Sequence, residues 1–222
     1  MKKLIALAML ALPAGAAFAD GVAAGLTAGT LGAGAQIAFR LRDDLNLRAG
    51  VNGIDFSYGY DYRGVDYDNR VKLFNVPVIA DWFPMKGTFL GMFRVSAGLA
   101  WNQNKIEATG RPRSGVYTIG NNTYSAPQIA SVQGEAKYDS LAPYVGVGLG
   151  NPVLSGKRFG WNVDLGLMYQ GRPKTSYNVV CGTGVNCAQL QADASIEAGD
   201  FDHDMSKYRL YPLAQVYLTW QF

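Results

Sequence analysis

Residues 207–222 carry a two-residue alternation that very few folds can accommodate. The even positions are almost wholly apolar, whereas the odd positions include Arg209, Gln215 and Gln221. Because successive side chains of a β-strand point to opposite faces, the segment predicts a strand with one apolar and one largely polar face. Strands of soluble proteins average only five or six residues. The length of this pattern therefore favours a strand that crosses a membrane.

The same alternation recurs in seven segments further upstream, with Ile79 as a lapse on a polar face. These segments are residues 22–28, 33–40, 45–52, 74–82, 93–104, 141–150 and 159–172. On the apolar faces, pairs of aromatic residues such as Phe74 and Trp82 stand eight positions apart. In a tilted strand this spacing covers roughly 20 Å along the membrane normal, close to the ~25 Å apolar band of a membrane barrel. The sequence thus predicts eight strands whose apolar faces contact lipid.

Composition and the first residues indicate export. Charged residues make up 17% of the chain, against roughly 25% in soluble domains, and the net charge of +3 with no basic run argues against a nucleic-acid partner. Lys2 and Lys3 precede an apolar run, and Ala17 and Ala19 fit a small-x-small cleavage site. This pattern predicts a signal peptide over residues 1–19, cleaved after Ala19, and one mature domain over residues 20–222. The alternative is a buried N-terminal helix.

The links between the predicted strands alternate in length, except that the link around Gly29 and Thr30 is short where a long loop is expected. Residues 43–44, 84–88 and 151–158 are short links, whereas residues 60–70, 105–138 and 177–206 are expected to be long loops. In a barrel with an even strand number, the short turns and both termini lie on the periplasmic side, and the long loops lie outside. Within the last loop, residues 188–198 are rich in helix-forming residues and predict a short helix.

The ending that alternates through Ala214, Val216, Leu218 and Trp220 to Phe222 resembles, together with the signal peptide, the signature of bacterial outer-membrane β-barrels. The strand count and size are similar to the small OmpA, OmpX and OmpW class. The resemblance implies an all-β fold, an eight-stranded antiparallel transmembrane β-barrel in the cell outer membrane among its lipids and lipopolysaccharide. It also implies that Leu218, Trp220 and Phe222 serve recognition by the barrel-assembly machinery. We expect a monomer.

Five charged residues are predicted to point into the lumen, which in an eight-stranded barrel is just wide enough for side chains to fill. Pairing about the presumed turns places Arg40, Arg48, Asp81 and Arg94 at similar height near the periplasmic end, with Asp164 entering from the far side. Buried charges persist only when paired, so we expect Asp81 to bridge Arg48 and Arg94. The resulting polar plug has two interpretations, a gate or selectivity constriction and a satisfied barrel core.

Two further arginines, Arg172 and Arg209, are predicted to point inward nearer the outer rim. They have two interpretations: attraction of anions into the mouth, or pairing with loop acids such as Asp139 or Asp200.

The last predicted loop holds three further features. Cys181 and Cys187 are expected to form a structural disulfide, because an exported chain is oxidised and no further metal-ligand spacing accompanies them. Residues 200–204 place His203 among three acids, which allows either a divalent-ion site or a solvated acidic rim. For a hydrolase, His203 is the sole base, with Ser206 or Asp204 as its partner, and no nucleophile motif accompanies it. We therefore expect no enzyme, cofactor or metal.

Tyrosines Tyr58, Tyr60, Tyr62 and Tyr67 crowd the first predicted loop. They suit adhesion to a protein or sugar, and they equally suit a strand leaving the membrane interface. The sequence thus predicts a non-catalytic structural or surface-interaction role, with a narrow, porin-like channel for small or hydrophobic solutes as the alternative. It identifies no extracellular ligand.

Overall fold

The structure is a computed structural model that describes residues 21–62, 64–153 and 158–222. The predicted signal peptide and its cleavage site after Ala19 lie outside the described residues. Eight strands build the barrel. They are β1 (Val22–Gly29), β2 (Gly32–Arg42), β3 (Leu45–Tyr62), β4 (Val65–Trp82), β5 (Phe93–Asn102), β10 (Leu141–Leu149), β11 (Phe159–Tyr169) and β13 (Leu210–Gln221).

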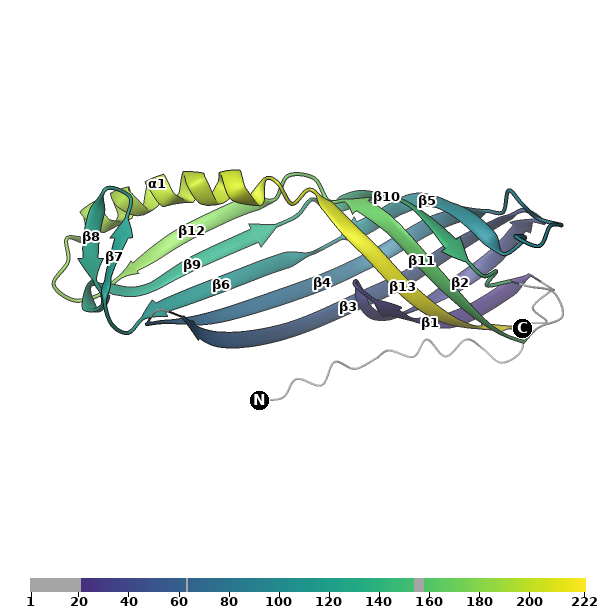
Figure 1. The fold of residues 1–222 in the computed structure, drawn as a ribbon, viewed down its shortest axis with the longest axis horizontal. Coiled ribbons are helices and arrows are strands. Elements are labelled where there is room, and N and C mark those ends of the chain that lie inside the picture. Colours follow the sequence, from purple (N-terminus) through teal and green to yellow (C-terminus); the bar gives the residue numbers. More distant parts are fainter. Residues whose placement is uncertain (1–20, 63, 154–157) are drawn as a thin grey trace.

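These eight strands form a closed antiparallel ring (Figure 1). Each strand pairs with the next in the order β1, β2, β3, β4, β5, β10, β11 and β13, and β13 pairs back with β1. Closure leaves the barrel without free edges. The predicted fold class, an eight-stranded antiparallel β-barrel, is confirmed. The C-terminal end lies at the end of the barrel that carries the short turns (Figure 1), and we call this the short-turn end.

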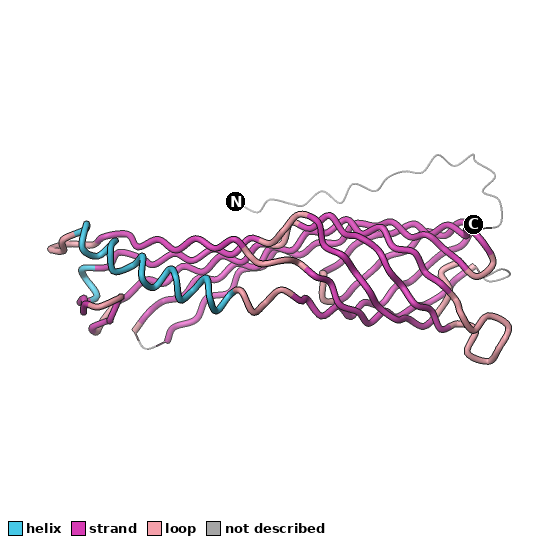
Figure 2. The backbone as a smooth tube through the Cα atoms, turned by 90° about the horizontal axis from the view of Figure 1, so that it is seen from above, coloured by secondary structure: helices cyan, strands magenta, loops and turns pink. Residues whose placement is uncertain are grey.

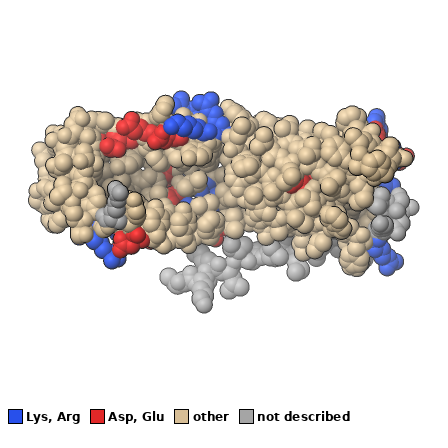
Figure 3. All heavy atoms as spheres, viewed as in Figure 1, with Lys and Arg blue, Asp and Glu red and all other residues tan. Residues whose placement is uncertain are grey.

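The alternation read from the sequence becomes the inside and outside of the barrel. Along β13, Val216 and Leu218 are exposed to 51% and 65%, whereas the alternating residues Gln215 and Tyr217 are buried. The outer surface of the barrel is apolar, so it is more stable in contact with the hydrocarbon chains of lipids than with water. In Figure 3 most acidic and basic side chains on this face lie over the extension or at the short-turn end, and the barrel wall between these two groups is almost uncharged.

On the side opposite the short-turn end, the structure continues beyond the barrel. The outer halves of β3 and β4 carry on as a sheet with β6 (Lys105–Pro112), β9 (Ile129–Lys137) and β12 (Lys174–Cys181), in the order β3-β4-β6-β9-β12. A small hairpin, β7 (Val116–Ile119) with β8 (Asn122–Ser125), and the 3₁₀ helix η1 (Ala126–Gln128) complete it together with helix α1 (Cys187–Met205). We call this part the extension (Figure 2).

The extension corrects the prediction of three long loops. Residues 60–70 contain the turn of one tall hairpin, since β3 and β4 stay paired from Asp55 and Lys72 up to Tyr62 and Val65. Residues 105–138 hold β6, β7, β8 and β9, and residues 177–206 hold the end of β12 and all of α1. The two-residue period continues through these segments, and neighbouring strands provide the backbone partners that a loop lacks.

Helix α1 has nineteen residues and is longer than the predicted 188–198. The Asn186 side chain caps its start by accepting from the backbone N–H of Gln189. Residues 200–204 belong to the helix and not to a loop, and the ring of Phe201 packs against Tyr177 of β12. None of the helices among the described residues has the length and apolarity that crossing a membrane would require.

Candidate functional site

The inward faces of the barrel strands bring four of the five predicted belt residues together. Arg48 of β3, Asp81 of β4, Arg94 of β5 and Asp164 of β11 are each at most 2% exposed. Their side chains form a closed set of two arginines and two aspartates, which we call the quartet. The quartet is electrically neutral, as a buried ionic group must be to persist.

Both aspartates of the quartet contact both arginines. Arg48 Nε donates to Asp81 Oδ2 at 2.5 Å, and its Nη2 donates to Asp164 Oδ2 at 2.8 Å. Arg94 Nη2 donates to Asp164 Oδ1 at 2.6 Å, whereas its Nε lies 3.6 Å from Asp81 Oδ1. Asp164 is therefore the closer bridge between the arginines, a role that the sequence assigned to Asp81.

Neighbouring groups hold the quartet in place. Ser96 Oγ donates to Asp81 Oδ1 at 2.6 Å, and the guanidinium of Arg48 lies 5.0 Å from the ring centroid of Tyr217, a cation–π distance. Gly148 of β10 leaves the space that the quartet fills. A Cβ at this position would collide with Asp164 Oδ1 and lie 2.9 Å from Arg94 Nε.

The fifth belt residue, Arg40, is not part of the quartet. Its Nη2 donates to the carbonyl of Val153 at 2.5 Å, in the link between β10 and β11 at the short-turn end. The sequence placed Arg40 at the right end of the barrel, but the register between strands directs its guanidinium to the turn. The interior ionic site therefore consists of Arg48, Asp81, Arg94 and Asp164.

An apolar layer fills the lumen directly above the quartet, on the side of the extension. Leu31, in the turn between β1 and β2, folds into the barrel and is 2% exposed. Ile79, the lapse in the alternation of β4, points into the same layer. The layer consists of Leu31, Ile79, Ala100, Ala142, Tyr144, Met168 and Leu213, with Tyr211 packed against it. The Tyr144 ring lies where a Cβ at Gly166 would collide with it.

A layer of amides covers the apolar layer at the mouth of the barrel. Asn75 Nδ2 donates to Asn104 Oδ1 at 3.0 Å, and Asn104 Nδ2 donates to Gln170 Oε1 at 2.6 Å. Asn102 Nδ2 donates to the carbonyl of Asp139 at 3.0 Å. All four amide side chains are buried. This layer cannot be recognised from the sequence, because amide side chains on polar strand faces form no charge pattern.

A cavity of about 20 Å³ remains in the lumen beside the quartet and the apolar layer. Gln36, Tyr144 and Gln215 are among its lining residues. Gln36 Nε2, Tyr144 Oη and Gln215 Nε2 are buried without a hydrogen-bond partner among the described residues. A cavity of this size has room for one water molecule and not for a larger solute.

Arg172 and Arg209 lie near the mouth, with partners other than those expected. Arg172 Nη2 pairs with Asp202 of α1 at 3.1 Å, and Thr175 Oγ1 donates to the same carboxylate at 2.9 Å. Arg209 Nε donates to the carbonyl of Ser206 at 2.9 Å. Both arginines thus contact the C-terminal end of α1, where cationic groups suit the helix dipole.

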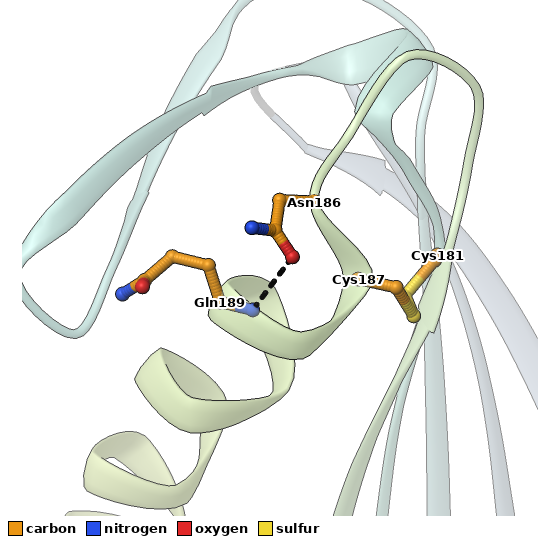
Figure 4. Close-up of a disulfide and its surroundings, with 4 residues drawn as sticks. All are labelled: Cys181, Asn186, Cys187 and Gln189. Carbon is orange, nitrogen blue, oxygen red and sulfur yellow. Dashed lines mark hydrogen bonds between the residues drawn. A yellow bond between two sulfur atoms is a disulfide. The ribbon is translucent and has the colours of Figure 1, made fainter.

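The start of helix α1 is tied to the extension by a disulfide and by a buried carboxylate. Cys181 and Cys187 are bonded across six positions of sequence, at the junction of β12 and α1 (Figure 4). Asp193 is 4% exposed and accepts from Asn122 Nδ2 at 2.8 Å and from the hydroxyl of Tyr124, both on the β7–β8 hairpin. These hydrogen bonds hold the pKa of Asp193 below its usual value and raise the pKa of Tyr124 to about 12.

The remaining loop candidates have simpler surroundings. Ser206 Oγ donates to the backbone carbonyl of His203 at 2.7 Å, and Asp204 pairs with Lys207 at 2.7 Å, so these contacts close the helix end and do not form a nucleophile–base pair. Among the described residues, no group of three or more His, Cys, Asp or Glu side chains is placed to hold a metal ion. Phe56, Tyr58 and Tyr60 stack in succession along β3, with Tyr67 of β4 beside Tyr60.

The residues of the predicted assembly signature lie on the outer surface near the short-turn end. Leu218, Trp220 and Phe222 are exposed to 65%, 48% and 49%. The backbone N–H of Phe222 donates to the carbonyl of Val22 at 3.2 Å. The last residue is therefore part of the seam between β13 and β1.

Comparison with known proteins shows the fold. No family model matches the chain, and no curated protein sequence matches it. Two solved structures of the Acinetobacter baumannii outer-membrane protein CarO are similar to it. The structure titled CarO is 24% identical with a TM-score of 0.62, and the one titled CarO2 is 23% identical with a TM-score of 0.63. Each match covers 91% of this chain and 98% of the other. The chain has the fold of a bacterial outer-membrane β-barrel.

Proposed function

We propose that this chain is an integral outer-membrane protein with a barrel closed to solutes and a non-catalytic role in envelope integrity, surface interaction, or both. Residues 1–19, with their predicted signal peptide, support export, and the barrel fold with its apolar exterior supports the outer membrane as the destination. The long connections, which form the extension, are then on the cell surface.

The observation that carries the proposal is the filling of the lumen. From the short-turn end upward, a solute would meet the quartet, then the apolar layer, then the buried amides. The quartet does not open readily, because leaving one charge of a buried ion pair without its partner costs about 3–5 kcal/mol. The apolar layer offers a passing ion no hydrogen bonds. A barrel filled in this way supports a role outside its lumen.

Surface interaction is supported by the ordered build of the extension. Five strands, a disulfide and a helix make a rigid platform above the membrane, and rigid elements present contact residues at a lower entropic cost than loops do. Phe56, Tyr58 and Tyr60 are exposed to 44%, 50% and 50% on the edge strand of this platform. Aromatic residues of this kind often anchor contacts with partners.

A non-catalytic role agrees with the chemistry of the described residues. His203 is the one histidine of the sequence, and its neighbours Ser206 and Asp204 are engaged by a backbone carbonyl and by Lys207. For assembly we propose that Leu218, Trp220 and Phe222 are read by the barrel-assembly machinery while the strand is still unpaired. The closed pairing of β13 with β1 and β11 supports a monomer as the folded unit.

The alternative is a narrow channel for small or hydrophobic solutes, and one observation favours it. The unpartnered polar atoms of Gln36, Tyr144 and Gln215 around the lumen cavity are groups that a passing polar molecule would satisfy. Opening the path would require the quartet or the apolar layer to rearrange. The two functions therefore differ in what they require of Asp81 and Asp164.

Conductance across a planar bilayer separates the two functions. The refolded wild-type chain is expected to give no steady current and no swelling of liposomes in sugar solutions. Asp81→Ala, which leaves two arginines opposite one aspartate, is expected to admit water and to give small, flickering currents, whereas Asp44→Ala at an exposed turn leaves the bilayer silent. A steady wild-type conductance that Asp81→Ala leaves unaltered would contradict the closed barrel and support the channel.

A further inference from the structure

Four lysines lie directly opposite one another on four neighbouring strands of the extension. The registers pair Lys72 of β4 with Lys105 of β6, Lys105 with Lys137 of β9, and Lys137 with Lys174 of β12. Residues that pair directly in a sheet project from the same face. The four ammonium groups therefore form a row that crosses about 14 Å of sheet at the usual strand spacing. We call it the lysine row.

The lysine row lies on the continuation of the lipid-facing surface. On β4 the outward residues of the barrel wall include Trp82 and Val78, which are 51% and 48% exposed, and Phe74 and Lys72 have the same parity. Lys72 precedes Phe74 by two residues and therefore lies about 7 Å further along the strand, away from the barrel. The row thus begins where the aromatic edge of the apolar band ends, at the level of lipid headgroups.

Like charges directly opposite each other destabilise a sheet, and the chain compensates this row only in part. Lys105 Nζ lies 2.6 Å from Glu107 and 2.6 Å from Glu135, and Lys137 Nζ lies 2.6 Å from Glu135. Lys72 and Lys174, at the two ends, form no ion pair with another described residue, and both are exposed. Asp55, the register partner of Lys72, pairs with Arg70. The four lysines and Arg70 therefore exceed the carboxylates of Asp55, Glu107 and Glu135 by two positive charges, which an anion at the membrane surface would neutralise.

A polar hollow of about 620 Å³ lies on the same face, directly above the lysine row. On all five strands its lining includes residues from the next two outward rows. These are Ser57, Arg70, Glu107, Glu135 and Ser176, then Gly59, Asp68, Thr109, Gln133 and Asn178. The intervening residues Tyr58, Asn69, Ala108 and Gly134 complete the lining. The ring of Phe201 packs near Gly134 from the opposite face and is not part of it. Hydroxyl, amide and carboxylate groups in a hollow suit the hydroxyls of sugars.

We propose that the lysine row and the hollow bind the phosphorylated sugar headgroup of an outer-leaflet lipid. Its phosphates contact the ammonium groups of Lys72 and Lys174 and the remaining donors of Lys105 and Lys137, since each ammonium has three donors. Its sugars enter the hollow, from which Glu107, Glu135 and Asp68 repel phosphate. The inference rests on the proposed outer-membrane location. The source is a membrane lipid and not a soluble sugar phosphate, because the row is continuous with the lipid-facing wall.

The test measures binding of purified lipopolysaccharide to the full-length refolded chain in detergent by native mass spectrometry and by titration. Lys72→Gln/Lys174→Gln removes the two lysines without ion pairs, and its binding is expected to be at least tenfold weaker. Lys86→Gln/Lys207→Gln, which removes the same charge away from the row, is expected to bind as the wild type does. Lys72→Arg/Lys174→Arg keeps the charge and is expected to retain binding. Phosphatase-treated lipopolysaccharide is expected to lose affinity for the wild type to the same extent as the glutamine variant loses it.

Three results would overturn the inference. They are equal binding by the glutamine variant and the wild type, equal binding of the dephosphorylated lipid, and equally tight binding of a soluble glucosamine phosphate. Heat-dependent migration in detergent gels checks that each variant is folded. If the glutamine variant does not fold, the inference is tested by the arginine variant, which is expected to bind lipopolysaccharide as the wild type does, and by the dephosphorylated lipid. If the chain does not insert into bilayers, the proposed function itself is refuted. If it inserts but binds phosphorylated and dephosphorylated lipopolysaccharide equally, only the lipid site is refuted.

Discussion

Replacing Asp164 by asparagine removes one negative charge from the quartet and leaves the size of the side chain unchanged. In the wild type the carboxylate accepts from Arg48 at 2.8 Å and from Arg94 at 2.6 Å, and none of the three side chains is more than 2% exposed. The variant therefore leaves two buried guanidiniums opposite Asp81 alone. Removing one partner of a buried ion pair costs about 3–5 kcal/mol. We expect the unfolding equilibrium constant to rise roughly 150-fold to 5,000-fold.

Reversible guanidinium unfolding in detergent micelles, followed by tryptophan emission, measures this loss. Trp82, Trp101, Trp161 and Trp220 are all exposed on the apolar exterior, so their emission reports departure from the micelle. Asp44→Asn is the matched control, because Asp44 pairs with Arg42 at an exposed turn. Asp44→Asn is expected to change the free energy of unfolding by about 0–1 kcal/mol, as for most surface ion pairs.

A double-mutant cycle tests whether the loss comes from the ionic contact. Arg94→Gln combined with Asp164→Asn restores neutrality and leaves the Arg48–Asp81 pair intact, so the double variant is expected to lose less than the sum of the two single losses. Coupling between residues in contact is typically about 0.5–3 kcal/mol. A loss below about 1 kcal/mol for Asp164→Asn, the level of a surface pair, or strict additivity in the cycle, would refute the reasoning.

Four further predictions concern other residues of the molecule. Cys181→Ser/Cys187→Ser opens a loop of seven residues and is expected to cost about 2.4 kcal/mol by loop entropy; faster hydrogen exchange confined to α1 supports this, and equal exchange with and without the bond contradicts it. The hydrogen bonds from Tyr124 and Asn122 lower the pKa of Asp193. Ionised Asp193 therefore stabilises the attachment of α1 at pH values above its ordinary pKa of 3.8, and this stabilisation is lost as the pH falls through the lower pKa of the folded state. Proteolysis of α1 is expected to increase on acidification below pH 3.8 in the wild type but not in Asp193→Asn. The pKa of Tyr124 is raised to about 12 by its contact with Asp193. Its hydroxyl therefore stabilises the attachment of α1 fully below pH 10, and this stabilisation is lost as the pH rises through about 12. Proteolysis of α1 is expected to increase over this range in the wild type but not in Tyr124→Phe. Gly148→Ala is expected to collide with Asp164 and to lower the yield of refolded barrel. Gly199→Ala, at a position with open space and no positive φ, is the control and is expected to refold as the wild type does.

The barrel was predictable because its two faces meet different surroundings. Each outward residue of β13 must suit hydrocarbon and each inward residue must fit a narrow lumen, so the period of two persists over the whole strand. Ile79 looked like an error in this pattern. In the structure the lumen contains an apolar layer directly above the quartet, and Ile79 points inward because it packs in this layer.

The extension was missed although the same period runs through it. In residues 55–60, aromatic side chains alternate with polar ones or glycine, as in a strand. Because one face is polar and no apolar partner sheet is evident, this segment is predicted as a loop. The pairing of β6, β9 and β12 depends on contacts far apart in the sequence. The lysine row was invisible for the same reason, since each lysine stands on a different strand.

Part of the quartet was predictable and part was not. Successive strands share short turns, so residues such as Arg48 and Asp81 can be aligned by counting from them. Asp164 reaches the arginines across the lumen, and neither its distance to Arg94 nor the departure of Arg40 toward Val153 follows from counting along adjacent strands. These placements depend on barrel shear, which fixes heights around the ring.

Spin labels placed one at a time on residues 213–220 of β13 test the central account most directly, with the native cysteine pair left oxidised and the protein in lipid bilayers. A closed barrel in a membrane predicts that Ala214, Val216 and Leu218 are reached by oxygen dissolved in the lipid. Leu213, Gln215, Tyr217 and Thr219 are then reached by neither oxygen nor a water-soluble nickel reagent. High nickel accessibility at Gln215 and Tyr217 would mean a water-filled lumen, and equal accessibility at all eight positions would mean that the strand does not separate lipid from a packed interior.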